Sequence, residues 1–154
     1  MSPETLAKAR ALALEEARKA ALRDEVPVGA VIVRRETGEV VAVGSNNREA
    51  RQSALGHAEL VAIEAASQAV GSWRLEGCEM VVTLEPCPMC LGALQQARIE
   101  SVVYLAPDPK GGALSLGYRL HEDVRTNHRF SVILEPMTEA SEMLTRFFQG
   151  KRKK

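Results

Sequence analysis

The chain has 154 residues, of which 45% are hydrophobic and 26% are charged, and its formal net charge is zero. This length and composition indicate one globular domain with a real core, and the charge gives no sign of a strongly basic nucleic-acid binder. The chain has no apolar run long enough to span a bilayer and no signal-peptide pattern at its start. We therefore expect a cytoplasmic protein without membrane association.

The first part of the chain predicts a helix, a hairpin, a loop and a second helix. Ser2 is a suitable helix cap before Pro3, and Gly38 closes a turn between two β-branched runs. Gly71 follows an apolar helical pattern and marks its end. These signals predict a helix at residues 3–22, strands at 28–33 and 40–43, a loop at 44–56 and a second helix at 57–70.

The second part of the chain alternates strands and helices. Its strands are expected at residues 80–84, 102–105 and 131–134, its helices at 88–98 and 138–148, and a long loop at 107–127. A strand, a helix and a strand in immediate succession form a right-handed parallel unit. The sequence therefore predicts an α/β fold with three layers, in which helices cover both faces of a mixed five-stranded sheet. We expect a domain over residues 1–150 and a basic tail over residues 151–154.

Two segments carry residues that bind metals. His57 stands about thirty residues before Cys87 and Cys90, and the two cysteines are three positions apart at the start of a helix. Histidine and cysteine are zinc ligands, and a catalytic zinc keeps three protein ligands and one open position. In an open α/β sheet the helices that follow parallel strands begin at one edge, so the three side chains can meet there. The sequence predicts one zinc ion held by His57, Cys87 and Cys90.

Glu59 lies two residues after the predicted histidine ligand and does not share its helix face. Zinc lowers the pKa of a water to near neutrality. A carboxylate beside that water can move its proton to a ring nitrogen and then to a departing amine. The pairing of His-x-Glu with Pro-Cys-x-x-Cys is the signature of zinc nucleobase deaminases. Glu59 is thus the predicted catalytic acid and base.

Three simpler roles for these residues each leave part of the pattern unaccounted for. A structural zinc site needs a fourth ligand, but a strand at roughly 3.3 Å per residue would hold Cys78 about 20 Å or more from Cys87. A thioredoxin-like dithiol would leave Glu59 without a role. A histidine that satisfies a core hydrogen bond does not account for this spacing from a Pro-Cys-x-x-Cys. The catalytic zinc site uses all four residues.

The wider sequence resembles the bacterial tRNA-specific adenosine deaminases. The resemblance covers nearly the whole chain and is carried by residues 25–31, 57–59, 83–90, 92–93, 108–113 and 127–129, and by the closing helix with Phe147-Phe148. It implies the cytidine-deaminase fold, a homodimer with one Zn²⁺ per subunit, and hydrolysis of adenosine to inosine at the wobble position of a tRNA anticodon, with release of ammonia. It also implies an arginine tRNA as the partner.

The same resemblance assigns substrate contacts. Asn46 matches an asparagine that touches the flipped nucleoside, although Asn47 beside it fits the same register. Asp108 matches a residue that touches ribose, where a polar side chain could read a 2′-hydroxyl. The resemblance also places Val28, Ala58 and Lys110 at the substrate. Two segments depart from the usual family pattern, Ser53–Gly56 and Leu114–Leu116, and both concern the fit to RNA.

Two rival functions share the zinc motif. A deaminase of free guanine or cytosine would need a closed pocket, whereas an enzyme acting on RNA needs an open one with positive charge for phosphates. Arg146, the basic tail and the Asp108-Pro109-Lys110 loop favour RNA. The other rival is a zinc-stabilised RNA-binding subunit without catalysis, and such a subunit would have no need of Glu59.

Overall fold

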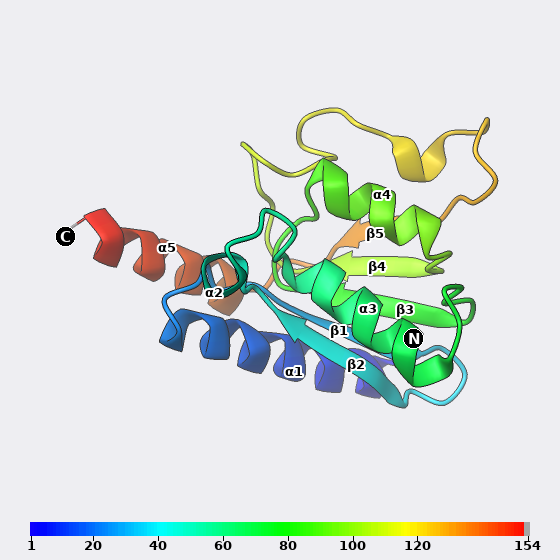
Figure 1. Cartoon of the computed structure of the whole chain (residues 1–154), viewed down its shortest axis with the longest axis horizontal. Coiled ribbons are helices and arrows are strands. Elements are labelled where there is room, and N and C mark those ends of the chain that lie inside the picture. Colours follow the sequence, from blue (N-terminus) through cyan, green and yellow to red (C-terminus); the bar gives the residue numbers. More distant parts are fainter. Residues whose placement is uncertain (153–154) are drawn as a thin grey trace.

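The computed structural model describes residues 1–152 and places a five-stranded sheet between two layers of helices (Figure 1). The strand order is β2-β1-β3-β4-β5. β1 runs antiparallel to both β2 and β3, whereas β3, β4 and β5 are parallel to one another. The strands are β1 Gly29–Arg34, β2 Val40–Ser45, β3 Cys78–Val82, β4 Ser101–Tyr104 and β5 Ser131–Leu134. The predicted α/β fold with a mixed five-stranded sheet is confirmed.

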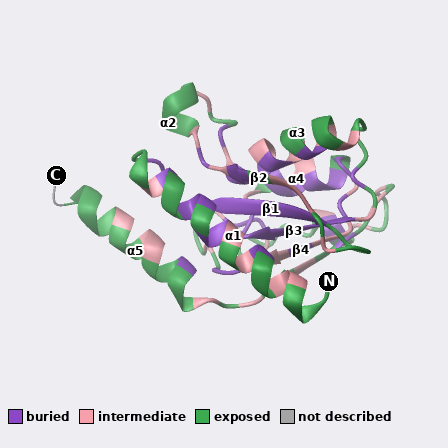
Figure 2. Ribbon diagram, turned by 90° about the horizontal axis from the view of Figure 1, so that it is seen from below, coloured by how far each residue is buried: buried purple, intermediate pink, exposed green. Residues whose placement is uncertain are grey.

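The helices cover both faces of this sheet, as predicted. One face packs against α3 and α4, and the other packs against α1 and the start of α5. Figure 2 shows the inward side of α1 buried and most of α5 exposed. The helical elements are α1 Pro3–Leu22, α2 Arg48–Arg51, α3 Ala58–Val70, α4 Pro88–Gln96, the 3₁₀ turn η1 Leu120–Glu122 and α5 Thr138–Arg152. None of the helices in the described part of the chain is long and apolar enough to cross a membrane.

Close packing of α3 on the sheet fixes the start of that helix. A Cβ built on Gly44 of β2 would lie 2.7 Å from the backbone nitrogen of Ala62, so only glycine lets α3 approach this strand so closely. Ala58, Ala62 and Ala66 present small side chains to the sheet and are fully buried. The position of His57, which immediately precedes α3, is therefore set by the core.

The sequence prediction differs from the structure mainly in the loop before His57. Residues 44–56 were expected to be irregular, but β2 extends to Ser45 and the short helix α2 lies within this stretch. The strand expected at residues 80–84 is Cys78–Val82, and the helix expected at 88–98 ends at Gln96. α5 continues past the expected Phe148 to Arg152, so Lys151 and Arg152 belong to its last turn. Lys153 and Lys154 lie outside the described residues, and the domain boundary at residue 150 stays a prediction.

Candidate active site

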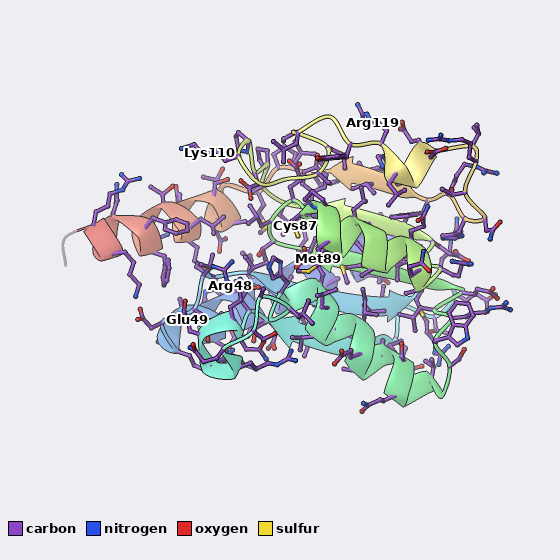
Figure 3. The ribbon with its side chains drawn as sticks, turned by 45° about the horizontal axis from the view of Figure 1, so that its top comes forward. Arg48, Glu49, Cys87, Met89, Lys110 and Arg119 are labelled. Carbon is purple, nitrogen blue, oxygen red and sulfur yellow. The ribbon has the colours of Figure 1, made fainter. Side chains whose placement is uncertain are left out.

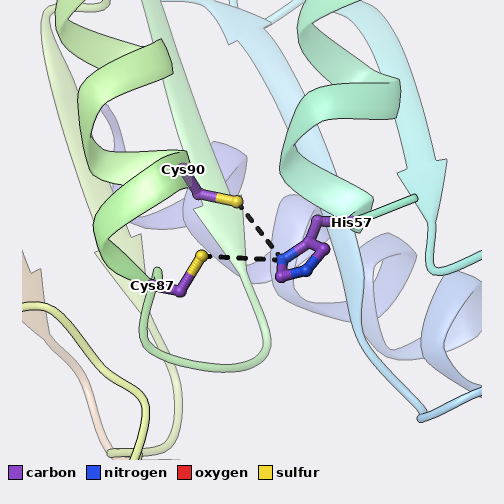
Figure 4. Close-up of side chains that lie close together, drawn as sticks. All are labelled: His57, Cys87 and Cys90. Atoms are coloured by element: carbon purple, nitrogen blue, oxygen red, sulfur yellow. Dashed lines mark hydrogen bonds between the residues drawn. The ribbon is translucent and has the colours of Figure 1, made fainter. Parts of the chain in front are cut away.

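Three metal-ligating side chains meet where α3 and α4 begin (Figure 4). His57 is the N-cap of α3, and Cys87 is the N-cap of α4. Cys90 lies one turn into α4 and is fully buried. The Nδ1 atom of His57 lies 3.6 Å from Sγ of Cys87 and 3.5 Å from Sγ of Cys90. The parallel β3-α4-β4 unit and the antiparallel hairpin before α3 thus bring together segments thirty residues apart.

This arrangement fits a tetrahedral zinc ion. The three ligand atoms all lie within 4.8 Å of one another. Nitrogen and sulfur ligands of a tetrahedral zinc, at about 2.0 and 2.3 Å from the metal, are about 3.5 Å apart, close to the two separations from His57. Within residues 1–152 these three form the only group of three or more His, Cys, Asp or Glu side chains that could hold a metal ion, and Cys78 is not among them. The predicted three-ligand set is therefore present without a fourth protein ligand.

The thiols of Cys87 and Cys90 differ in acidity because one donates a hydrogen bond to the other. The hydrogen bond from Cys90, together with the bond to His57, lowers the pKa of the Cys87 thiol to about 4. The same contact with Cys87 raises the pKa of Cys90. The bond to Cys87 also raises the pKa of His57 above its ordinary value. A thiolate is the form of cysteine that binds metal, so the site provides an anionic ligand at neutral pH.

Glu59 is the only titratable side chain of the first turn of α3, and it is 4% exposed. Burial raises the pKa of its carboxyl group to about 7, from a usual value of 4.5. A group with this pKa can both accept and donate a proton near neutral pH. The arrangement therefore combines three side chains that could hold a metal ion with a carboxyl group able to exchange a proton near neutral pH.

A cavity of about 560 Å³ opens above these groups. His57, Glu59 and Cys87 form part of its wall, and four of the five predicted substrate contacts do as well. Arg48, from the start of α2, and Lys110, from a loop, lie on either side of Cys87 (Figure 3). The residues that line the cavity are Val26, Val28, Asn46, Arg48, His57, Glu59, Leu84, Glu85, Cys87, Pro107, Asp108, Lys110, Leu144 and Phe148.

Asn46 is held in place by the backbone on both sides of the site. Its N–H donates to the carbonyl of Val28 at 3.1 Å, and its Oδ1 accepts from the N–H of Ala58 at 2.8 Å. Ala58 is fully buried and does not line the cavity, so its N–H serves Asn46. Asn47 is also absent from the cavity wall, which favours Asn46 over its neighbour.

Arg48 was missed by the sequence prediction because a buried glutamate distant in sequence positions it. Glu25 is 2% exposed, and its carboxylate accepts the N–H groups of Glu49 at 3.0 Å and Ala50 at 2.8 Å. These are the free N–H groups at the start of α2, and the N-cap Asn47 makes no side-chain bond to them. Glu25 thus does the work of a helix cap and holds Arg48 at the cavity.

Several further residues of the wall also escaped prediction. Leu144 and Phe148 belong to α5, whose approach to the cavity depends on the tertiary fold. Glu85 was the most accessible to sequence reasoning, since it stands two residues before Cys87. Its position in a buried, apolar stretch was a signal that this carboxylate has partners.

The family model for the cytidine and deoxycytidylate deaminase zinc-binding region matches residues 3–106. The chain belongs to this deaminase family. The match covers the two segments that carry the ligands, and it confirms the zinc deaminase interpretation of the motif.

The relatives of this deaminase include enzymes that act on tRNA. The tRNA-specific adenosine deaminase of Bacillus subtilis is 46% identical over 143 residues, which cover 92% of this chain and 88% of the relative. A solved structure from work on A-to-I editing by tRNA:A34 deaminases at the wobble position has a TM-score of 0.81 and 42% identity. It covers 90% of this chain and 99% of its own.

A purine deaminase of another kind shares the fold. The guanine deaminase of Bacillus subtilis gives a TM-score of 0.63 at 28% identity, over 100% of this chain and 96% of that one. Both comparisons confirm the predicted cytidine-deaminase-like architecture, and the higher TM-score and identity belong to the tRNA enzyme.

Proposed function

We propose that this chain is a zinc-dependent adenosine deaminase that converts adenosine to inosine at the wobble position of a tRNA anticodon and releases ammonia. The observation that carries the proposal is the gathering of His57, Cys87 and Cys90 beside Glu59 in an open cavity. The likeness to tRNA-specific adenosine deaminases over 92% of the chain supports the choice of substrate.

The chemistry divides between the metal and one side chain. Bound zinc supplies Lewis-acid activation of water near neutral pH. Glu59 accepts a proton from the attacking water and delivers it to N1 of the adenine ring, where electron density develops as C6 is attacked. It then transfers the second proton to the departing amine, which leaves as ammonia. Its raised pKa of about 7 suits a residue that performs both transfers.

Recognition is assigned to the rest of the cavity wall. Asn46 keeps its amide nitrogen without a hydrogen bond to any of residues 1–152, so this group is available to the target nucleoside. Asp108 can reach ribose, and Arg48 and Lys110 supply positive charge for phosphates at the rim. Val28 packs against the base. Ala58 acts through Asn46, to which it donates its N–H.

The remaining parts of the proposal concern partners and location. We propose a homodimer that acts on the anticodon stem-loop of an arginine tRNA in the cytoplasm, as the family resemblance implies. The names of the relatives at 41–46% identity, which are tRNA-specific adenosine deaminases, support the tRNA substrate. The basic end of α5 lies near the cavity through Phe148, and Lys151 and Arg152 extend it. This end suits the phosphates that flank a target nucleotide.

The test is inosine formation on a short RNA hairpin with adenosine at the wobble position, beside free adenine, guanine, cytosine and cytidine. We expect conversion of the hairpin alone, and its loss in Glu59→Ala with zinc retained. Conversion of free guanine and not of the hairpin would make the chain a free-base deaminase, like the guanine deaminase that shares its fold. Zinc binding without turnover of any substrate would favour a non-catalytic subunit.

A further inference from the structure

The proposed chemistry leaves one buried carboxylate of the cavity wall without a role. Glu85 is 3% exposed and lies on the segment that joins β3 to the ligand Cys87. It forms no ion pair with any of residues 1–152. A buried carboxylate without a cation has to be stabilised by hydrogen-bond donors.

Three donors from the loop over residues 108–115 meet this carboxylate. Oε1 accepts the N–H of Asp108 at 3.1 Å and the hydroxyl of Ser115 at 2.6 Å, and Oε2 accepts the N–H of Ser115 at 2.9 Å. Both ends of the loop are thus tied to one side chain. The N–H of Ala113 also donates to the carbonyl of Pro86 at 2.8 Å, so the loop is fastened to the metal-binding segment at several points.

The loop closes over the carboxylate too tightly for a side chain. A Cβ at Gly112 would overlap the carboxylate of Glu85 and lie 2.8 Å from the carbonyl oxygen of Asp108. The N–H of Gly112 donates to that carbonyl at 2.8 Å, and the N–H of Gly111 donates to Oδ1 of Asp108 at 3.1 Å. Only glycine at position 112 therefore leaves room for the carboxylate of Glu85 in this position.

We propose that Glu85 is a positioning residue, which holds the loop over residues 108–115 so that Asp108 and Lys110 stand at the rim of the cavity in the geometry that binds a polynucleotide. The proposal rests on the proposed function of this site. Glu85 does not touch the substrate in this scheme and acts through the loop. The segment that carries the metal ligand Cys87 thereby also sets the substrate-binding loop.

The isosteric variant Glu85→Gln is the main test. An ionised carboxylate only accepts hydrogen bonds, whereas a glutamine amide must direct its NH₂ group at one of the two backbone N–H groups or at the Ser115 hydroxyl. One buried donor then loses its acceptor, and the loop is released. We expect the KM for the RNA hairpin to rise about tenfold, kcat to stay within about threefold, and the zinc content to stay unchanged.

Gly112→Ala should disrupt the same contact between Glu85 and the loop, by a change in the loop itself. It should raise the KM about as much as Glu85→Gln, and the double variant should be no worse than either single one, since both break one contact. Gly92→Ala is the matched control, because its added Cβ would meet only Leu120 Cδ2, at 3.9 Å. This control should leave the KM unchanged.

Limited trypsin digestion reports on the loop without any substrate. Cleavage after the exposed Lys110 should become at least about tenfold faster in both variants and stay slow in the wild type. Unchanged KM and unchanged cleavage in Glu85→Gln would overturn the proposal. So would a loss of zinc with a fall in kcat alone, because Glu85 would then support only Cys87. A wild-type protein that does not convert the hairpin would refute the proposed function, and the trypsin result would still decide whether Glu85 holds the loop.

Discussion

The buried carboxyl group of Glu59 should lower the folding stability of the wild-type protein at neutral and alkaline pH. Glu59 has its pKa raised by burial to about 7, against 4.5 for the ordinary side chain. The folded protein therefore binds this proton more tightly than the unfolded chain does, so stability falls as the pH rises from about 4.5 to about 7. Above that window the whole cost of a buried charge is present. Glu59→Gln cannot ionise and should be free of it.

The size of this effect follows from the shift. A change of about 2.5 pKa units corresponds to about 3 kcal/mol of folding free energy at pH 8, and to under about 1 kcal/mol at pH 5. For a chain of this length, a gain of about 3 kcal/mol raises the Tm by about 6–12 °C. The glutamine variant should therefore be more stable at pH 8 and nearly unchanged at pH 5, although it loses turnover.

Unfolding in urea and by heat, between pH 5 and pH 8 with a chelator present, measures this difference. Glu64→Gln is the matched control, because Glu64 lies in the same helix and is exposed. It should change stability little at either pH. Added zinc should shrink the gain of Glu59→Gln, since a nearby cation stabilises the carboxylate.

Two results would refute this reasoning. One is a Glu59→Gln variant that is no more stable than the wild type at pH 8. The other is a gain of equal size at pH 5 and pH 8, because a packing effect does not follow the titration of a carboxyl group.

Three further predictions concern the metal, the rim and the basic end. Removal of the metal with a chelator should abolish deamination, and added zinc should restore it; activity that survives at undetectable zinc would exclude the metal mechanism. Glu25→Ala should destabilise the protein by about 1–3 kcal/mol, measured by urea unfolding, because two N–H groups of α2 lose their acceptor. Deletion of residues 151–154 should weaken binding to the RNA hairpin and reduce its salt dependence, and should cost under about 1 kcal/mol of stability, since the Lys151–Asp24 ion pair is exposed. An unchanged affinity and salt slope would leave these residues without a role in binding.

The parts of the fold that depend on neighbouring residues were predictable. The helix at Pro3–Leu22 was expected with the bounds it has, because Ser2 accepts the N–H of Thr5 and Pro3 begins the first turn. The strand at Ser131–Leu134 also agrees. The zinc ligands were predictable because their spacing places them at two helix starts that share an edge of the sheet.

The parts that depend on distant contacts were not predictable. α2 has no buried residue and no apolar period, and its N–H groups are satisfied by Glu25, more than twenty residues earlier. Arg48 could not be placed at the cavity without that contact. The extension of α5 to Arg152 is likewise accompanied by an ion pair of Lys151 with Asp24, at 2.6 Å, far away in the sequence.

The predicted metal ligands and the residues at the rim of the cavity lie on different parts of the fold, and this has a consequence for how the substrate specificity could change. The ligands and Glu59 lie on helices packed into the core, whereas Arg48 begins the exposed helix α2 and Asp108 and Lys110 lie on a surface loop. Surface loops accept insertions and substitutions that core helices do not. A combinatorial library restricted to residues 48–55 and 108–110 should therefore change which base or which nucleic acid enters while its members keep the same reaction. The residues at the rim of the cavity can thus vary while the residues that carry the reaction stay fixed. Directed evolution of substrate specificity can therefore begin at the rim.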